Sequence, residues 1–181
     1  MNSIQTTIKT DRIYEGRILN LRVDTVEMPD KKYAKREIVE HQKGVGVIAF
    51  DGNDKIRIVK QYRKAVDSFM LEIPAGLVDA NEDPIDAVKR EMQEEIGYDS
   101  NDVTYLFDVY SSPGFTNSRT SLFVAKNLFK SQLEPDEDEF IEKISLKVDD
   151  LYEKVLNYEI SDSKTVIGIL IAKKIINDGT L

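Results

Sequence analysis

The chain has 181 residues, of which 41% are hydrophobic and 32% are charged. This composition is typical of one globular domain with room for a small additional element, and it excludes intrinsically disordered and membrane-embedded proteins. A net charge of −8 disfavours nucleic-acid binding, and the absence of cysteine excludes disulfides, thiolate metal sites and cysteine nucleophiles.

Residues 1–40 are predicted to form an extension of antiparallel strands. Their polar start, MNSIQTTIKTDR, lacks the apolar segment of a signal peptide, so we expect a cytoplasmic protein. Residues 11–28 alternate apolar and polar side chains around Gly16, and residues 33–41 continue this pattern after the turn PDKK. The predicted division is therefore an N-terminal extension, 1–40, and a main domain, 41–181.

The main domain is predicted to combine strands with helices. GVGVIAF is typical of a buried strand, and the turn DGND connects it to a returning strand at 55–63. A proline interrupts the short extended segment 71–75. Later strands are predicted at 103–112, 119–128 and 142–148, and two closing helices at 149–159 and 161–178. Because hairpins and helices interleave, we predict an α+β fold, an α/β/α sandwich with a mixed central sheet flanked by helices.

The clearest predicted helix lies between Asp83 and Gly97. Asp83 is suited to cap its start, Pro84 fits the first turn, and Gly97 fits the left-handed position after its end. Apolar residues recur at helical spacing and predict a stripe that faces the core: Ile85, Val88, Met92 and Ile96.

Three glutamates of this helix gather away from the apolar stripe. An α-helix advances by about 100° per residue, so Glu91 and Glu95 lie nearly above one another, with Glu94 beside them. Such neighbours repel unless a cation binds them, and Mg²⁺ prefers carboxylate oxygens. Arg90 is placed to pair with Glu94, and Glu82 to fold back toward the same face. On the three glutamates alone, a solvated acidic face is a simpler explanation than a metal site.

The wider spacing resembles the Nudix box over residues 76–98. Its fixed positions are filled without a gap by Gly76, Glu82, Arg90, Glu91, Met92, Glu94, Glu95, Gly97 and Tyr98. The chain is thus similar to the Nudix hydrolases, which cleave a nucleoside diphosphate linked to another moiety with magnesium and an attacking water. The resemblance makes a metal site more probable than a solvated acidic face.

The resemblance implies roles for the box residues. The box would form a loop–helix–loop in which Glu91 and Glu95 are the principal metal ligands. Glu94 would bind the metal directly or through water, and Arg90 would orient the carboxylates. The cofactor implied is Mg²⁺, with Mn²⁺ as a substitute. The remaining box positions would support the loops: Gly76, Glu82 and Gly97.

Four further segments resemble the ADP-ribose pyrophosphatase subfamily: KREIVEH, VKQYRKAVDSFMLEIPAGLVD, YSSPGFTN and DEDEFIE. The turn Pro113-Gly114 after the box is a marker of that subfamily. The implied reaction is hydrolysis of ADP-ribose to AMP and ribose 5-phosphate. In such enzymes the carbonyl of the residue before the box glycine, here Ala75, also binds metal. The acidic loop would supply Glu137 as general base and Glu139 as a further ligand, with the reverse assignment open.

The same resemblance implies substrate contacts. Arg36 and Arg63 match positions that reach the substrate phosphates or the terminal ribose, where they would supply positive charge to an acidic protein. Tyr14 is the candidate for stacking on adenine, unless the strand register places Arg17 there. Gly114 would lie against the substrate.

The resemblance also implies an assembly and leaves alternatives open. The N-terminal strands of similar enzymes are exchanged between subunits, so we expect a homodimer. The net charge of −8 and the short apolar runs predict neither nucleic-acid nor membrane partners. Asn117-Ser118 stands where many relatives carry an acidic pair, which keeps another nucleoside diphosphate sugar or a dinucleotide open as substrate. A non-catalytic nucleotide-sugar sensor is the alternative from another class, but sensors have incomplete boxes and here every catalytic glutamate position is filled.

Overall fold

The computed structural model describes residues 3–134 and 140–179. Contacts divide the chain into two compact units. The first unit joins Met1–Lys43 to Tyr110–Arg119, and the second joins Gly44–Val109 to Thr120–Leu181. The boundary predicted at residue 40 lies near the end of the first of these segments. The segment from Tyr110 to Arg119 is distant in sequence, yet it belongs with the N-terminal strands.

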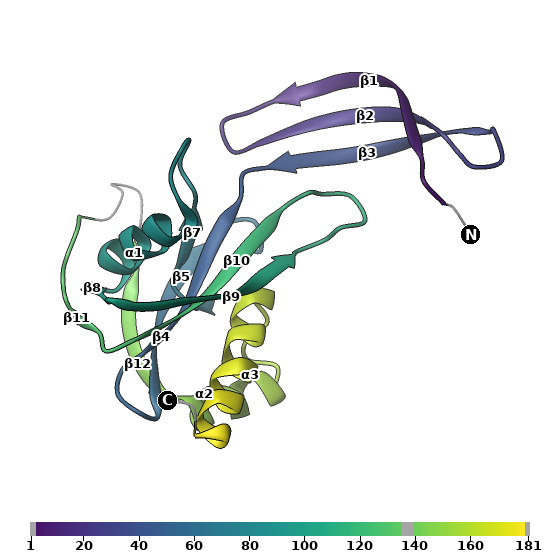
Figure 1. Cartoon of the computed structure of the whole chain (residues 1–181). Coiled ribbons are helices and arrows are strands. Elements are labelled where there is room, and N and C mark those ends of the chain that lie inside the picture. Colours follow the sequence, from purple (N-terminus) through teal and green to yellow (C-terminus); the bar gives the residue numbers. More distant parts are fainter. Residues whose placement is uncertain (1–2, 135–139, 180–181) are drawn as a thin grey trace. The chain divides into compact units, whose positions relative to one another are not determined.

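The first unit is built on a three-stranded antiparallel sheet, β1-β2-β3, in which β1 spans Thr6–Glu15, β2 Leu19–Glu27 and β3 Tyr33–His41. This confirms the predicted antiparallel strands (Figure 1). The segment 110–119 is bonded to β3: Val39 donates its N–H to the carbonyl of Phe115 at 2.8 Å. The side-chain oxygen of Asn117 accepts the N–H of His41 at 2.9 Å. These bonds explain why the Pro113-Gly114 turn belongs to this unit.

The second unit contains a seven-stranded sheet: β4 (Gly44–Phe50), β5 (Lys55–Arg63), β6 (Ser68–Glu72), β7 (Ala75–Leu77), β9 (Asp102–Tyr110), β10 (Arg119–Lys126) and β12 (Glu142–Lys147). The main order is β12-β5-β4-β10-β9, with β6 paired to β5 and β7 to β4. Strands β4 and β10 run parallel, whereas β5 is antiparallel to β4, β6 and β12. The sheet is therefore mixed, as predicted.

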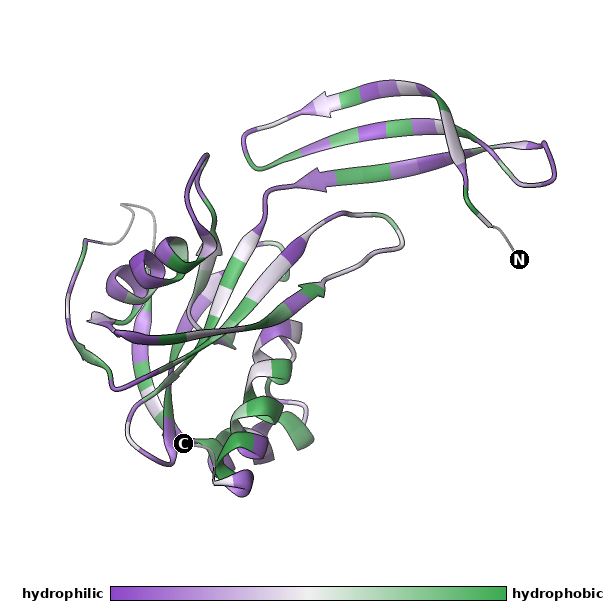
Figure 2. Ribbon diagram, viewed as in Figure 1, coloured by the Kyte–Doolittle hydropathy of each residue, from purple (hydrophilic) through white to green (hydrophobic). Residues whose placement is uncertain are grey.

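Helices cover both faces of this sheet: α1 (Pro84–Glu95) lies on one face, and α2 (Val148–Leu156) and α3 (Ser163–Asp178) lie on the other (Figure 1). Alternate residues of β4 supply the two cores, since Val45 and Val47 pack with α1 whereas Ile48 and Phe50 pack with α2 and α3. In Figure 2, the ribbon of α3 carries more hydrophobic residues than that of α1. Each fully buried aliphatic side chain contributes about 1.5–3 kcal/mol to folding. The predicted α/β/α sandwich is confirmed.

One predicted core position in α1 is wrong. Ile85 is 40% exposed, whereas Val88, Met92 and Ile96 are buried as predicted. Ile85 stands in the first turn, and Ala87 takes a buried place beside Val88 instead. The buried face of α1 is thereby rotated toward its glutamates.

Two short strands were not predicted: β8 (Tyr98–Asp99), which begins at the last box residue, and β11 (Phe129–Lys130). They pair with each other in antiparallel orientation. Two residues are too few to show a periodic pattern. None of the described helices combines the length and the hydropathy that a membrane crossing requires.

Candidate active site

The sequence around α1 fixes where this helix starts and stops. The Asp83 side chain accepts the N–H of Ile85 at 3.0 Å and caps the start, followed by Pro84 in the first turn. After the helix, Gly97 adopts a φ of 76°, which is costly for a residue with a side chain. These caps place the glutamates of the last turns beside β7, which precedes the helix in the chain.

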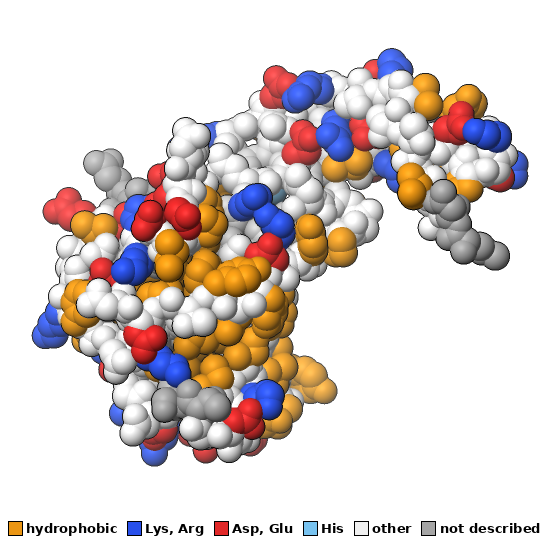
Figure 3. Space-filling view, viewed as in Figure 1, with side chains coloured by type: hydrophobic (Ala, Val, Ile, Leu, Met, Phe, Trp, Pro, Cys, Tyr) orange, Lys and Arg blue, Asp and Glu red, His pale blue; other side chains and the backbone are white. Residues whose placement is uncertain are grey.

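The guanidinium of Arg90 joins this group of acidic side chains. It donates from Nε and Nη2 to both oxygens of Glu82, at 3.0 and 3.1 Å. Its Nη1 donates to Glu91 at 2.7 Å and to Glu94 at 3.0 Å, and Nη2 also reaches the Leu77 carbonyl at 2.9 Å. The hydrogen bond from Arg90 lowers the pKa of Glu82, and the bonds to Glu82 and Glu91 raise the pKa of Arg90. Figure 3 shows acidic side chains gathered over α1.

Two of these carboxylates are buried. Glu91 is 7% exposed and Glu95 is 2% exposed. Glu95 accepts the backbone N–H of Ala75 at 2.8 Å, at the start of β7. The Glu91 carboxylate lies so close to Gly76 that a Cβ added to this glycine would stand 2.0 Å from the carboxylate carbon. Burying a carboxylate is costly unless it is paired, so a solvated acidic face does not explain the arrangement.

Replacing Gly76 by alanine is expected to displace Glu91 from Arg90. The added methyl group would overlap the carboxylate, and moving Glu91 away would break its charge-assisted hydrogen bond to Arg90, a loss of about 1.5–3 kcal/mol of stability. Urea denaturation would measure the loss. Gly114→Ala is the matched stability control, because a Cβ there meets no atom within 4 Å. Unchanged stability in Gly76→Ala would contradict the close packing of this carboxylate.

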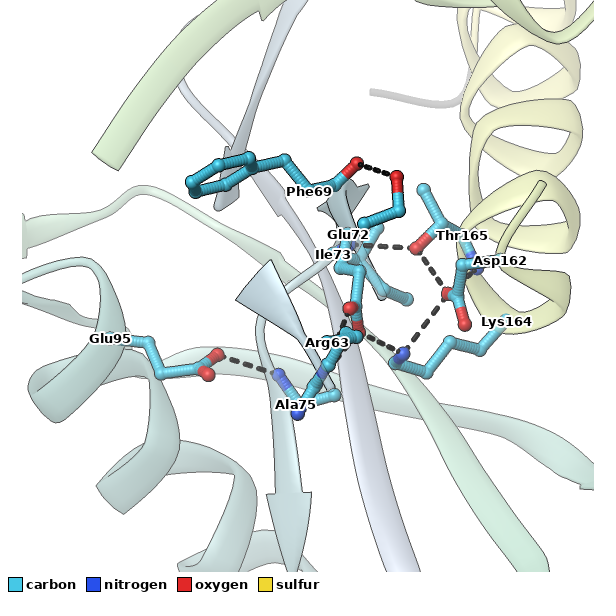
Figure 4. A network of polar contacts seen from close by, with 10 residues as sticks. Arg63, Phe69, Glu72, Ile73, Ala75, Glu95, Asp162, Lys164 and Thr165 are labelled. Carbon is cyan, nitrogen blue, oxygen red and sulfur yellow. Dashed lines mark hydrogen bonds and ion pairs between the residues drawn. The ribbon is translucent and has the colours of Figure 1, made fainter. Parts of the chain in front are cut away.

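Another buried carboxylate, that of Glu72, lies at the end of β6 and shortly before Ala75 (Figure 4). Glu72 is 2% exposed and accepts two bonds from Arg63, at 2.6 and 2.9 Å. Lys164, at the start of α3, donates to Glu72 at 2.5 Å and to Asp162 at 3.0 Å. Burial alone would raise the pKa of Glu72, but the bonds from Arg63 and the charge of Lys164 lower it. Arg63, predicted to contact substrate, is thus engaged with Glu72 in this structure.

Replacing Glu72 by glutamine is expected to cost about 3 kcal/mol at neutral pH, because it leaves Arg63 and Lys164 without their buried partner. The folded-state pKa of Glu72 lies below its ordinary value of 4.5. The carboxylate therefore stabilises the fold fully above that value, and the contribution disappears as the pH falls through the folded-state pKa. The difference in the free energy of unfolding between wild type and variant, measured by urea denaturation, should therefore shrink as the pH falls.

The matched control for this variant is Glu159→Gln, which breaks an exposed pair with Lys154. Exposed pairs contribute about 0–1 kcal/mol, so this variant should unfold almost like the wild type. An equal loss in both variants, or a loss at Glu72 that does not change with pH, would contradict the role given to the buried carboxylate.

The structure brings together most of the box residues singled out in the sequence. Ala75, Gly76 and the four glutamates converge around Arg90 and the start of β7, and all belong to the second unit. Glu137 and Glu139 lie outside the described residues, so their roles stay predictions.

The other predicted substrate contacts belong to the first unit. Tyr14 is an exposed residue of β1, and Gly114 lies in the exposed turn of segment 110–119. Arg36 donates from Nε to the side chain of Gln5 at 3.0 Å and from Nη1 to the Lys35 carbonyl at 2.9 Å. Their contacts with a substrate stay predictions.

The donor chemistry of the cluster suits a hard divalent cation. Glu91, Glu94 and Glu95 offer carboxylate oxygens from adjacent turns, and two of the three are buried. Among residues 3–134 and 140–179, no three acidic or histidine side chains already stand in metal-binding geometry. In the structure Glu91 and Glu94 point to Arg90 and Glu95 points to Ala75. A cation would therefore have to share these oxygens with their present donors.

Sequence reasoning missed Glu72, Lys164 and Thr165 as parts of this region. Thr165 accepts the buried N–H of Ile73 at 2.9 Å. One feature could have drawn attention to Glu72: a single acidic residue inside the apolar run FMLEIPA predicts a paired carboxylate in a buried strand. Lys164 and Thr165 carried no comparable indication, because their partners lie far away in the sequence.

Comparison with known proteins agrees with the fold and the box. The NUDIX domain family model matches residues 40–166, and the family model described as the nucleoside diphosphate sugar hydrolase N-terminal domain matches residues 6–39. A solved structure of an ADP compounds hydrolase superposes with a TM-score of 0.87 at 20% identity, covering 98% of this chain and 97% of that one. At this identity the likeness shows the fold.

Two curated relatives are similar over nearly their whole length. A methanol dehydrogenase activator of Bacillus methanolicus is 42% identical over 167 residues, covering 91% of this chain and 90% of the relative. An ADP-ribose pyrophosphatase of Bacillus subtilis is 37% identical over 167 residues, with the same coverage. The family model covers more than half of the chain, and the matched residues include α1 with its packed glutamates. The chain therefore belongs to the Nudix family of hydrolases.

Proposed function

We propose that the protein hydrolyses the diphosphate linkage of ADP-ribose, in a magnesium-dependent reaction that yields AMP and ribose 5-phosphate. The observation that carries the proposal is the pair of buried carboxylates, Glu91 and Glu95, packed against the start of β7 and fixed by Arg90 and Ala75. The relative from Bacillus subtilis, named an ADP-ribose pyrophosphatase, supports this choice of substrate.

Each residue of the cluster has a task in this proposal. Glu91, Glu94 and Glu95, with the Ala75 carbonyl, would hold the divalent ion against the diphosphate. When bound, the ion would offset the charge of the phosphates and acidify the attacking water. Arg90 binds Glu91 and Glu94 through the same nitrogen and so holds the two carboxylates side by side. This lowers the entropy that they lose when the ion binds.

The acidic loop completes the proposal. Glu137 would accept the proton of the attacking water, and Glu139 would be a further ligand. The Glu137→Gln variant should then lose far more turnover than Glu139→Gln at saturating magnesium. Equal losses in the two variants would contradict this division of roles.

A panel hydrolysis assay with product identification tests the substrate. It includes ADP-ribose, other nucleoside diphosphate sugars, dinucleotides and dinucleoside polyphosphates, each with and without Mg²⁺. We expect ADP-ribose to give the highest kcat/KM and to yield AMP. Relatives named GDP-mannose pyrophosphatase, 30% identical over 181 residues, make other nucleotide sugars the principal competitors. Tight binding of a nucleotide sugar without turnover would instead identify a sensor.

We further propose that the N-terminal strands, residues 1–40, form a dimerisation element. Large apolar side chains are exposed on the first unit, among them Ile8, Ile13 and Tyr33. In a homodimer, a second copy of the sheet would cover such side chains. Light scattering should show a homodimer at micromolar concentration, and a monomer would contradict the proposal. Ile13→Glu should weaken the dimer, whereas Lys32→Glu, in an exposed turn of the same unit, should not.

The cytoplasmic location stays a prediction that cell fractionation would test.

A further inference from the structure

The corner between β6 and β7 is held from outside by the start of α3 (Figure 4). The buried N–H of Ile73 is accepted by the hydroxyl oxygen of Thr165 at 2.9 Å, and both residues are fully buried. The same hydroxyl donates to the carboxylate of Asp162 at 2.6 Å. Asp162 also accepts the backbone N–H of Thr165 at 3.0 Å and caps α3. The hydroxyl of Thr165 therefore connects the cap of a helix to the corner.

This corner leads directly to the box carboxylates. The Pro74 carbonyl accepts the N–H of Val47 in β4 at 2.9 Å. The next amide, that of Ala75, donates to Glu95 at 2.8 Å. The anchored amide of Ile73 and the amide that holds Glu95 are thus separated by one proline, whose ring restricts the backbone between them. A shift of the backbone at Ile73 would therefore also displace the Ala75 amide that donates to Glu95.

We propose that Thr165, oriented by Asp162, is a positioning residue for the hydrolysis. It fixes the backbone of residues 73–75 and thereby the Ala75 N–H, which donates to Glu95. The effect on metal binding rests on the proposed function, whereas the effect on the Ala75 amide rests only on the fold.

The side chain of threonine is suited to this task because its hydroxyl accepts one hydrogen bond while it donates another. Valine has nearly the same shape but would leave the N–H of Ile73 buried without an acceptor, which strongly disfavours the present corner. Serine keeps the hydroxyl. If Thr165 only stabilised the start of α3, its replacement would lower the stability of the protein without a specific effect on Glu95.

The test compares Thr165→Val with Thr165→Ser and with Ala172→Gly. Ala172 is buried in the later part of α3, so its replacement weakens the same helix away from the corner. Hydrogen exchange at the Ala75 amide is measured in metal-free protein, and Mn²⁺ affinity is measured by electron paramagnetic resonance without substrate. We expect Thr165→Val to speed exchange at Ala75 and to weaken Mn²⁺ binding by about tenfold or more, as loss of an outer partner of metal ligands typically does. Thr165→Ser should resemble the wild type, and Ala172→Gly should keep the wild-type Mn²⁺ affinity.

Equal Mn²⁺ affinity and equal Ala75 exchange in Thr165→Val and Ala172→Gly, at matched melting temperatures, would overturn the inference. If Thr165→Val does not fold, Asp162→Asn carries the same test, since it weakens the acceptor that orients the hydroxyl. Wild-type protein without magnesium-dependent turnover would refute the proposed function instead. In that case hydrogen exchange at the Ala75 amide would still show whether Thr165 fixes the corner between β6 and β7.

Discussion

Replacing Glu95 by glutamine is expected to lower kcat by about 10³-fold, equivalent to about 4 kcal/mol of transition-state stabilisation. Glutamine has nearly the same shape and keeps an oxygen that can accept the N–H of Ala75, now made at 2.8 Å. The fold should therefore survive. The variant loses the negative charge of Glu95, whose side chain is 2% exposed. The neighbouring glutamates occupy other positions and would not supply that charge in its place.

The matched control is Asp86→Asn, which makes the same chemical change on the exposed first turn of the same helix. Loss of an acidic residue at a helix start costs about 0.3–1 kcal/mol of stability, and turnover should stay near the wild-type value. Magnesium titrations of both variants, followed by release of AMP from ADP-ribose, would separate weaker metal binding from slower turnover. Wild-type turnover in Glu95→Gln would refute the metal-binding role of this carboxylate.

Local patterns predicted the helix boundaries because each depends on nearby residues. Asp83, Pro84 and Gly97 are found at the two ends of α1, where capping chemistry placed them. The pairing of Arg90 with Glu94, four residues later, was predictable for the same reason. Alternating hydrophobicity likewise predicted the strands on both sides of the box.

The burial of the glutamates could not be predicted in this way. The apolar stripe placed Glu91 and Glu95 outside the core, yet β7 packs against α1 and contacts both side chains, through Gly76 and Ala75. That crossing depends on the pairing of β7 with β4, a contact between segments about thirty residues apart. The links of Thr165 to Ile73 and of Lys164 to Glu72 span 92 residues each. Helical and strand periodicities contain no information about such distant partners.

Replacing Arg90 by methionine is expected to destabilise the metal-free protein by about 3 kcal/mol. This is the lower end of the cost of breaking a buried ion pair, because Glu91 is buried whereas Arg90 and the other two glutamates are partly exposed. Arg90 bonds to Glu82, Glu91 and Glu94 at 2.7 to 3.1 Å, so its loss removes the cation that these three carboxylates share. Methionine preserves much of the apolar stem of arginine, which confines the change mainly to the charge.

The distinctive part of this prediction is its dependence on magnesium. A ligand that binds the folded state alone stabilises it according to its concentration relative to Kd. In the variant a divalent ion would take the place of the guanidinium beside Glu91 and Glu94, so Mg²⁺ should recover part of the lost stability. Urea denaturation with Mg²⁺ and with a chelator measures this recovery, and Lys89→Met on the same helix is the control. A variant whose stability is equally low with and without Mg²⁺ would show that Arg90 and the ion do not share these carboxylates. Recovery of stability by Mg²⁺ would instead support a single acidic cluster whose carboxylates bind both Arg90 and a metal ion.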